Sequence, residues 1–141
     1  MNLRATFAFC GFVTLLCGIA AAGGDGMPSS FPLPTYHEDG ASNVQYRSDK
    51  NTTSLQYDVT DDMKDVVAWY RDRLKAQGFT VMMDQEFKDT QGYTRGMVAW
   101  SRCANHAYAS VQVGAVASGG GSSTPPGPGA EITLQSSKSG C

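Results

Sequence analysis

VTDDMKDVVAWYRDRLKAQGF, residues 59–79, predicts a single amphipathic helix with a start signal and a stop signal. Thr60 is the expected N-cap, because its hydroxyl can accept a hydrogen bond from a free amide of the first turn. Gly78 falls where a left-handed residue ends a helix, and Phe79 can then pack back on Leu74. Apolar side chains recur every three or four positions and form one face that needs an apolar partner: Met63, Val66, Val67, Tyr70 and Leu74.

Alternating apolar and polar residues on both sides of this helix predict strands at 44–46, 55–59, 79–84, 97–103, 107–116 and 131–135. The order β-β-α-β-β-β-β with short turns indicates an α+β, two-layer domain, in which an antiparallel sheet packs against one main helix. Val81 and Met83 are expected to share one face. The expected inward residues of the last three strands are Val98, Trp100, Val111, Val113, Ile132 and Leu134.

The first residues are typical of a secretory signal peptide rather than of the domain. A short positive start precedes about a dozen mostly apolar residues and the small residues Ala20-Ala21-Ala22. We expect export and cleavage after Ala22, the alternative being a buried N-terminal core segment. The predicted organisation is a signal peptide at 1–22, a disordered or extended arm at 23–34, and one domain at 35–141 with a flexible Gly/Ser/Pro loop at 118–129.

A lipid anchor is an alternative to simple cleavage. Leu15-Leu16-Cys17-Gly18 is similar to a bacterial lipoprotein site, in which Cys17 would become the lipidated N-terminus. Leu16 departs from the small residue that normally precedes that cysteine. The expected location is therefore periplasmic or secreted, alternatively the outer membrane as a lipoprotein, and membrane contact is expected only through Cys17.

Charge argues against nucleic acid as a partner. The chain has 11 Lys+Arg and 13 Asp+Glu, for a net charge of −2. Removing residues 1–22 also removes Arg4 and makes the net charge more negative. Binding to a phosphate backbone depends on clustered Lys and Arg, so we expect a protein partner, not yet identified, and no nucleic acid.

Two cysteines remain after cleavage of the signal peptide, Cys103 and Cys141. A pair of cysteines in an exported protein predicts a disulfide bond. Val98 and Trp100 are taken as the inward residues of their strand because Cys103 then lies on the outer face, where it can meet Cys141. The alternative is a free terminal thiol that pairs with another molecule.

No motif in the chain predicts catalysis, a cofactor or a metal. His37 and His106 fall in polar turns, and the neighbours of His37 cannot easily converge with it on one ion. Cys103 with His106 could form a nucleophile and a base, but a bridged Cys103 is the better interpretation. Residues 119–124 are Gly-rich, yet they contain no lysine and open no helix, as a phosphate loop would require.

Side chains that the pattern leaves partly outside the core predict an interface. Aromatic residues and methionine are enriched at protein interfaces, although scattered exposed apolar residues are also normal. The candidates are Tyr36, Trp69, Met82, Tyr93 and Tyr108.

The run from Pro34 to Phe79 resembles a group of uncharacterised bacterial envelope and lipoprotein α+β domains. The matching residues are Val66, Trp69, Tyr70, Leu74, Gly78 and Phe79. The resemblance implies an exported, non-enzymatic domain and implies no substrate.

The leading hypothesis is an exported envelope protein that acts without catalysis, as a binding or assembly module, by protein–protein contact. One alternative is a secreted inhibitor or immunity protein that blocks a hydrolase with the loop 118–129. Another is a small hydrolase, which would need a pocket lined by His106, Asp84 or Glu86.

Overall fold

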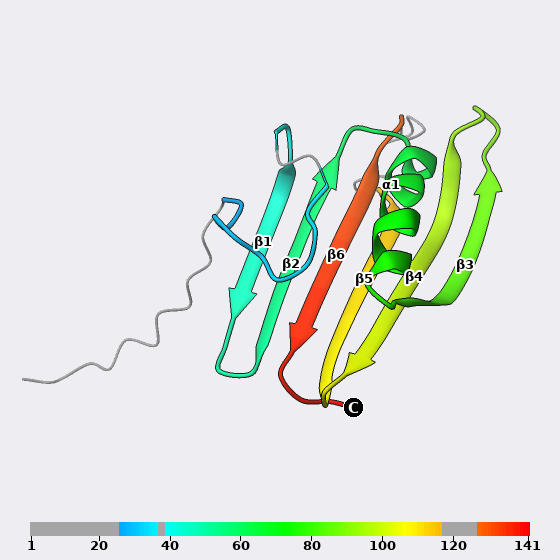
Figure 1. Ribbon diagram of the computed structural model, residues 1–141. Helices are drawn as coiled ribbons and strands as arrows, with labels where there is room; N and C mark the ends of the chain where they lie inside the picture. Colours follow the sequence, from blue (N-terminus) through cyan, green and yellow to red (C-terminus); the bar gives the residue numbers. More distant parts are fainter. Residues whose placement is uncertain (1–25, 37–38, 117–126) are drawn as a thin grey trace, which may run out of the picture.

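The structure is a computed structural model that describes residues 26–36, 39–116 and 127–141 (Figure 1). The predicted signal peptide, Cys17, His37 and most of the loop 118–129 lie outside these residues. The elements follow in the order β-β-α-β-β-β-β. Their bounds are β1 (Ser42–Ser48), β2 (Thr52–Val59), α1 (Met63–Ala76), β3 (Thr80–Lys88), β4 (Thr94–Ala104), β5 (Ala107–Ala115) and β6 (Ala130–Ser137).

The strands of the described chain form one antiparallel sheet with the order β1-β2-β6-β5-β4-β3. Strands that follow each other in the chain pair with each other, except β2 and β3, which α1 connects. Strand β6 lies between β2 and β5 (Figure 1). Leu134 of β6 lies opposite Leu55 on one side and Val111 on the other. The last strand therefore joins the two halves of the sheet, and β1 and β3 are left as its edges.

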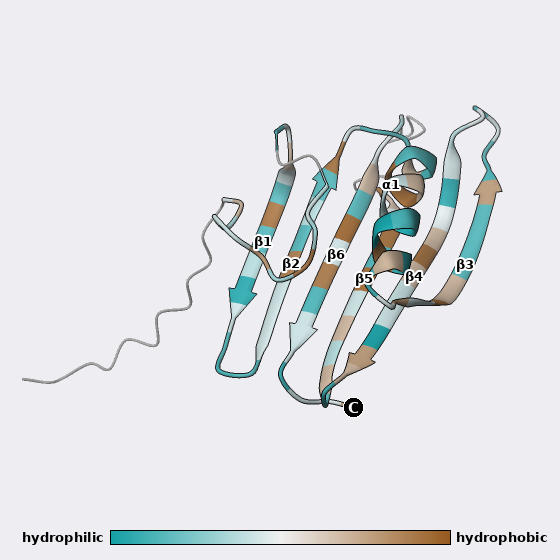
Figure 2. Ribbon diagram, in the orientation of Figure 1, coloured by the Kyte–Doolittle hydropathy of each residue, from teal (hydrophilic) through white to brown (hydrophobic). Residues whose placement is uncertain are grey.

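One face of the sheet is apolar and lies under α1. Residues directly opposite each other in antiparallel strands share a face, so the apolar residues form rows across the strands (Figure 2). One row is Tyr57, Ile132, Val113 and Val98, and the next is Leu55, Leu134, Val111 and Trp100. All eight are buried. The predicted inward orientation of the last three strands is confirmed.

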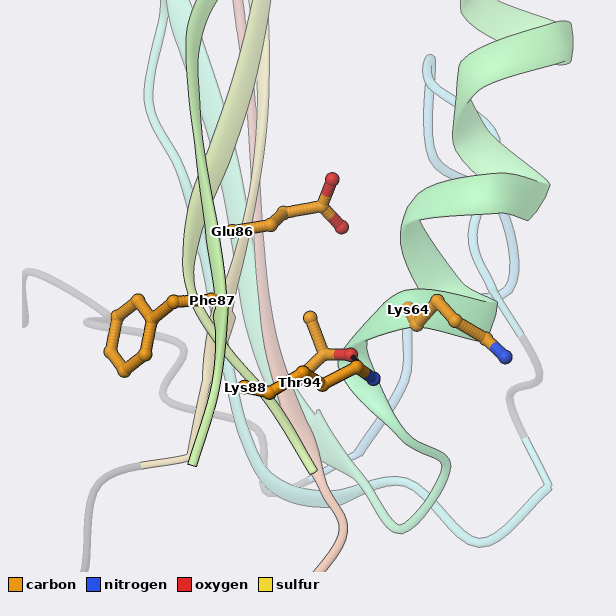
Figure 3. A pocket seen from close by; sticks show the side chains of 5 residues that line it. All are labelled: Lys64, Glu86, Phe87, Lys88 and Thr94. Atoms are coloured by element: carbon orange, nitrogen blue, oxygen red, sulfur yellow. Dashed lines mark hydrogen bonds between the residues drawn. The ribbon is translucent and has the colours of Figure 1, made fainter. Parts of the chain in front are cut away.

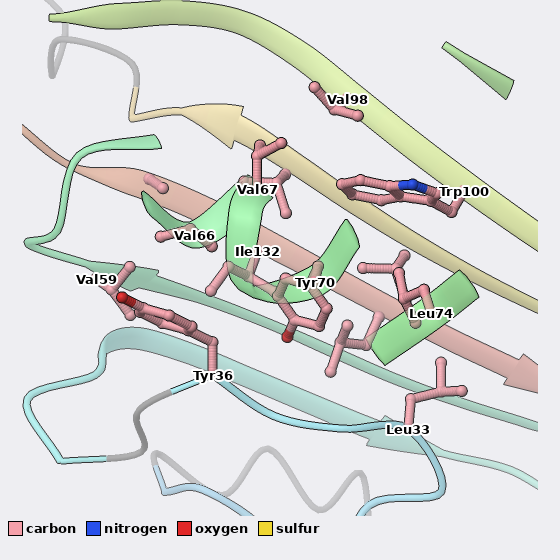
Figure 4. Close-up of a cluster of buried hydrophobic side chains, with 14 of the residues drawn as sticks. Leu33, Tyr36, Val59, Val66, Val67, Tyr70, Leu74, Val98, Trp100 and Ile132 are labelled. Atoms are coloured by element: carbon pink, nitrogen blue, oxygen red, sulfur yellow. The ribbon is translucent and has the colours of Figure 1, made fainter. Parts of the chain in front are cut away.

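Helix α1 buries the apolar face that the sequence predicts, with Met63, Val66, Val67, Tyr70 and Leu74 all buried (Figure 4). Its C-terminal end is also confirmed: Gly78 has φ +79°, and the Phe79 amide donates to the Leu74 carbonyl at 3.0 Å. The N-cap is Asp62, not Thr60, because the Asp62 carboxylate accepts from the Lys64 amide at 2.9 Å.

The segment before β1 covers the sheet beside α1, over β1 and β2 (Figure 1). Leu33 and Tyr36 are buried in the same core as α1 (Figure 4). The Tyr57 hydroxyl accepts from the Tyr36 amide at 2.8 Å and donates to the Tyr36 carbonyl at 3.0 Å. The Tyr70 hydroxyl donates to the Pro34 carbonyl at 3.0 Å. Burial raises the pKa of Tyr70, so this donor stays protonated.

The predicted fold class, a two-layer domain in which one main helix covers the sheet, is wrong. The six strands hold half of the described residues, and α1 has only 14. Six strands about 4.8 Å apart span about 24 Å, whereas a helix with its side chains is about 10 Å wide. Helix α1 accordingly packs on β4, β5 and β6. The segment with Leu33 and Tyr36 covers β1 and β2, and β3 stays open.

Candidate functional site

The open edge of the sheet carries the large exposed apolar side chains of the described residues. Val81, Met82 and Met83 of β3 are 52%, 68% and 41% exposed, Phe87 is 61% exposed, and Met97 of β4 is 39% exposed. We call these five residues the edge surface. Natural proteins usually cover or charge a long apolar edge strand, because its free backbone groups can pair with another chain.

A bulge decides which side chains the edge surface presents. The register between β3 and β4 shifts between Val81 and Met83, and the extra residue reverses the alternation. Val81 lies opposite Trp100, on the face of α1, whereas Met83 lies opposite Ala99, on the other face. The expectation that Val81 and Met83 share one face is therefore wrong.

A glycine holds β3 close to β4. Gly96 has φ +107°, and a Cβ atom there would lie 1.8 Å from the carbonyl oxygen of Gln85. Only glycine fits both the dihedral angle and the close approach. In this register Gln85 lies opposite Met97. Met97 is therefore on the outer face of β4, level with the gap between Met83 and Phe87 of β3.

The side of β3 that faces α1 is charged. Arg71 of α1 lies 3.6 Å from the Asp84 carboxylate and 3.4 Å from the Glu86 carboxylate. The Arg71 and Asp84 side chains are about half exposed, and that of Glu86 is 28% exposed. Exposed ion pairs contribute at most about 1 kcal/mol each. These contacts therefore orient the three side chains but do not cover β3.

A shallow groove of about 220 Å³ lies between the start of α1 and β3 (Figure 3). Its lining residues are Lys64, Glu86, Phe87, Lys88 and Thr94. Glu86 points toward α1, whereas the Phe87 ring lies on the opposite face of the strand (Figure 3). The Lys88 ammonium donates to the Thr94 hydroxyl at 2.6 Å. Charged side chains of α1 and β3 therefore line the groove, and the Phe87 ring points away from it.

Asp62 joins α1 to the start of β4 beside this groove. One carboxylate oxygen accepts from the Lys64 amide at 2.9 Å, and the other accepts from the Thr94 amide at 3.2 Å. Partial burial by itself raises the pKa of Asp62. The hydrogen bonds from Lys64 and Thr94 and the nearby Lys88 charge outweigh it, so the pKa is lowered.

Stability should therefore fall in acid through Asp62. A carboxyl whose folded pKa is below its unfolded value of about 3.9 contributes stability above that pH and loses it as the pH falls through the folded pKa. At pH 7, Asp62→Ala should destabilise the protein by about 1 kcal/mol, the usual worth of an N-cap. Urea denaturation at pH 7 and at pH 3 measures both effects. The control is Asp72→Ala on the exposed face of α1, and equal pH dependence in the two variants would contradict the role of Asp62.

Two of the predicted interface residues lie by the core and not on the edge surface. Tyr36 is 4% exposed, so the expectation that it lies outside the core is wrong. Its hydroxyl donates to Asp61, and its ring packs edge-on against Trp69. Trp69 is half-buried and has the Arg73 guanidinium 3.9 Å above its ring. Both aromatic rings therefore secure the N-terminal segment to α1.

The other three candidates are spread over the molecule. Met82 belongs to the edge surface, whereas Tyr93 precedes β4 and Tyr108 lies on β5, both half-buried. Sequence reasoning missed four members of the edge surface, which are Val81, Met83, Phe87 and Met97. The signal that could have found them is the unbroken apolar run of residues 81–83, which does not alternate with polar residues as a half-buried strand does.

Cys103 and Cys141 form the predicted disulfide bond, with Cα atoms 5.9 Å apart. Because Cys103 is bridged, it cannot act as a nucleophile with His106, which is exposed in the turn between β4 and β5. Within the described ranges, no three His, Cys, Asp or Glu residues are grouped to hold a metal ion. In the same ranges, no helix has the length and apolarity needed to cross a membrane.

Comparison with known proteins gives one finding. A protein-family model described as START domain-like matches residues 40–121, more than half of the chain, from the start of β1 to beyond β5. No curated protein and no solved structure matches the chain. The START-like fold is a helix-grip sheet, and it replaces the predicted two-layer class. The resemblance to bacterial envelope domains stays a prediction. The chain belongs to the START domain-like family.

Proposed function

We propose that this protein is an exported, non-catalytic binding module that contacts another protein through the edge surface. The observation that carries the proposal is the group of five large apolar side chains, 39–68% exposed, of which four lie on the uncovered edge strand β3 and one on the neighbouring β4. START-like domains are generally binding modules, which agrees with a binding role. The Cys103–Cys141 disulfide supports export, because such bonds persist in oxidising compartments.

A second candidate is a small ligand in the groove beside α1, which family membership favours. The groove measures about 220 Å³ and is open, whereas sites for drug-sized ligands usually measure about 300–1,000 Å³ and enclose most of the ligand. The space between α1 and β4–β6 is filled by buried side chains. The edge surface is therefore the better site. The inhibitor alternative stays a separate proposal, since most of its loop lies outside the described residues.

Site-specific photo-crosslinking tests the proposal. A photoreactive amino acid is placed at Met82 on the edge surface, or at Gln112, an exposed position on β5. In cells that make the protein, we expect a crosslinked partner from position 82 and none from position 112. Adding Phe87→Lys to the position-82 protein should abolish the crosslink, because a charge would then have to be buried at the contact.

The matched control is Gln112→Lys in the position-82 protein, which should leave the crosslink intact. Substitutions at exposed positions usually change stability by no more than about 0.5 kcal/mol, and thermal unfolding of both variants checks this. Equal crosslinking from positions 82 and 112, or crosslinking that survives Phe87→Lys, would overturn the proposal.

A further inference from the structure

We infer that the partner binds as an extended strand added to β3, with apolar residues on its outer face and basic residues on the face of α1. This inference rests on the proposed function. Strand β3 is nine residues long, ends the strand order, and is exposed at every residue. A free edge exposes a row of backbone donors and acceptors with which an extended chain can pair along its length.

The two faces of β3 favour different side chains on an added partner strand. On the outer face, Met83 and Phe87 flank Gln85, with Met97 behind them on β4. On the face of α1, Asp84 and Glu86 alternate with these residues. Side chains directly across two antiparallel strands interact, so an added strand would place alternate residues beside the apolar row and beside the carboxylates.

Charge decides what the inner residues of the partner must be. Arg71 is the cation paired with both Asp84 and Glu86. Lys88 lies on the same face at the end of this row, and when Asp62 beside it is counted the five groups have one negative charge in excess. Lys88 is turned to Thr94 and to the neighbourhood of Asp62. A lysine or arginine on the partner strand would balance the row, whereas an acidic residue would add to the excess.

A second copy of this chain fits the edge poorly. The two-fold register that pairs all of β3 with itself is centred on Asp84 and places the two Asp84 side chains opposite each other. A shift of the centre to Gln85 places Asp84 opposite Glu86. Like charges directly opposite each other destabilise a strand pair. The occupant that the charges favour is therefore a segment of another protein, in which apolar and basic residues alternate.

Synthetic peptides of nine residues, the length of β3, test this inference on the full chain. One peptide alternates valine with lysine, and a second alternates valine with glutamate. A third has the composition of the first with its lysines grouped at one end, which controls for general attraction of cations. A fourth is the first peptide with alternate backbone nitrogens methylated, which removes its strand hydrogen bonds.

Fluorescence anisotropy measures affinity, and hydrogen exchange locates the bound peptide. We expect the valine–lysine peptide to bind about tenfold or more tightly than the other three, because only it satisfies both the charges and the backbone. Its binding should slow amide exchange in β3. The double variant Asp84→Asn, Glu86→Gln should lose the preference for lysine over glutamate, while the exposed ion pairs it removes contribute little to the fold.

Three results would overturn the inference: no preference for the valine–lysine peptide, unchanged binding after methylation, or protection outside β3. Each of them leaves the proposed function standing if Phe87→Lys still abolishes the crosslink to the natural partner. If that crosslink does not depend on the edge surface, the proposed function fails instead. The two failures are thus distinguishable.

Discussion

Gly96→Ala is expected to destabilise the protein by about 4 kcal/mol and to release β3 from the sheet. A side chain at φ +107° is strained, which costs about 1–3 kcal/mol. The new Cβ atom would also lie 1.8 Å from the Gln85 carbonyl oxygen, and relieving such overpacking costs about 1–3 kcal/mol more. The contact is with backbone atoms of Gln85, so no side-chain rotation can relieve it.

Gly114→Ala is the matched control for this substitution. Gly114 lies on β5 opposite Met97, and a Cβ atom there would come no closer than 3.7 Å to the Gly96 carbonyl. We expect the control to change stability by less than about 1 kcal/mol. Urea denaturation measures the difference, and amide exchange shows whether β3 opens first. Equal stability of the two variants would show that β3 and β4 do not approach each other as described.

The same comparison bears on function. If β3 opens in Gly96→Ala while the rest of the sheet stays protected, the edge surface is lost without unfolding of the core. The crosslink from position 82 should then disappear, whereas Gly114→Ala should retain it. Gly96 would thus act as a positioning residue for the edge surface although it contacts no partner.

Local signals account for what could be predicted from the sequence. The apolar face of α1 repeats within each turn, and the ending at Gly78 and Phe79 involves residues only a few positions apart. The expected pairing with Cys141 placed Cys103 outward, and alternation then placed Val98 and Trp100 inward. The helix face, its end and the alternation depend on neighbours in the chain, and the distant cysteine pair could be predicted because only two cysteines remain after the expected cleavage.

The rest depends on residues distant in the chain. Tyr36 is buried because Tyr57 bonds its backbone from 21 positions away, and nothing near Tyr36 indicates that partner. Val81 and Met83 alternate as inward residues do, yet the bulge separates their faces and α1 does not reach over β3. Coverage of an edge strand is a property of the whole sheet, which explains why the edge surface was missed.

Removing the disulfide with Cys103→Ser is the second change expected to have a large effect, a loss of about 4 kcal/mol. The bond closes a loop of 38 residues, and such a crosslink lowers the entropy of the unfolded chain by an amount worth about 4 kcal/mol. The loop includes β5 and β6, and β6 pairs with both β2 and β5. The crosslink thus limits how far the strand that joins both halves of the sheet can separate from β4.

The alternative is that the bond only fastens the end of the chain, since Cys141 is exposed and follows β6 by four residues. Urea denaturation separates the two possibilities. If the bond acts on the unfolded state, Cys103→Ser, Cys141→Ser and the double variant should all lose the same stability, and the denaturant slope should rise because the unfolded chain exposes more surface. If it only fastens the end, midpoint and slope should stay unchanged, and faster amide exchange should be confined to residues 138–141. The central position of β6 favours the first outcome, because this strand cannot leave the sheet without breaking both of its ladders.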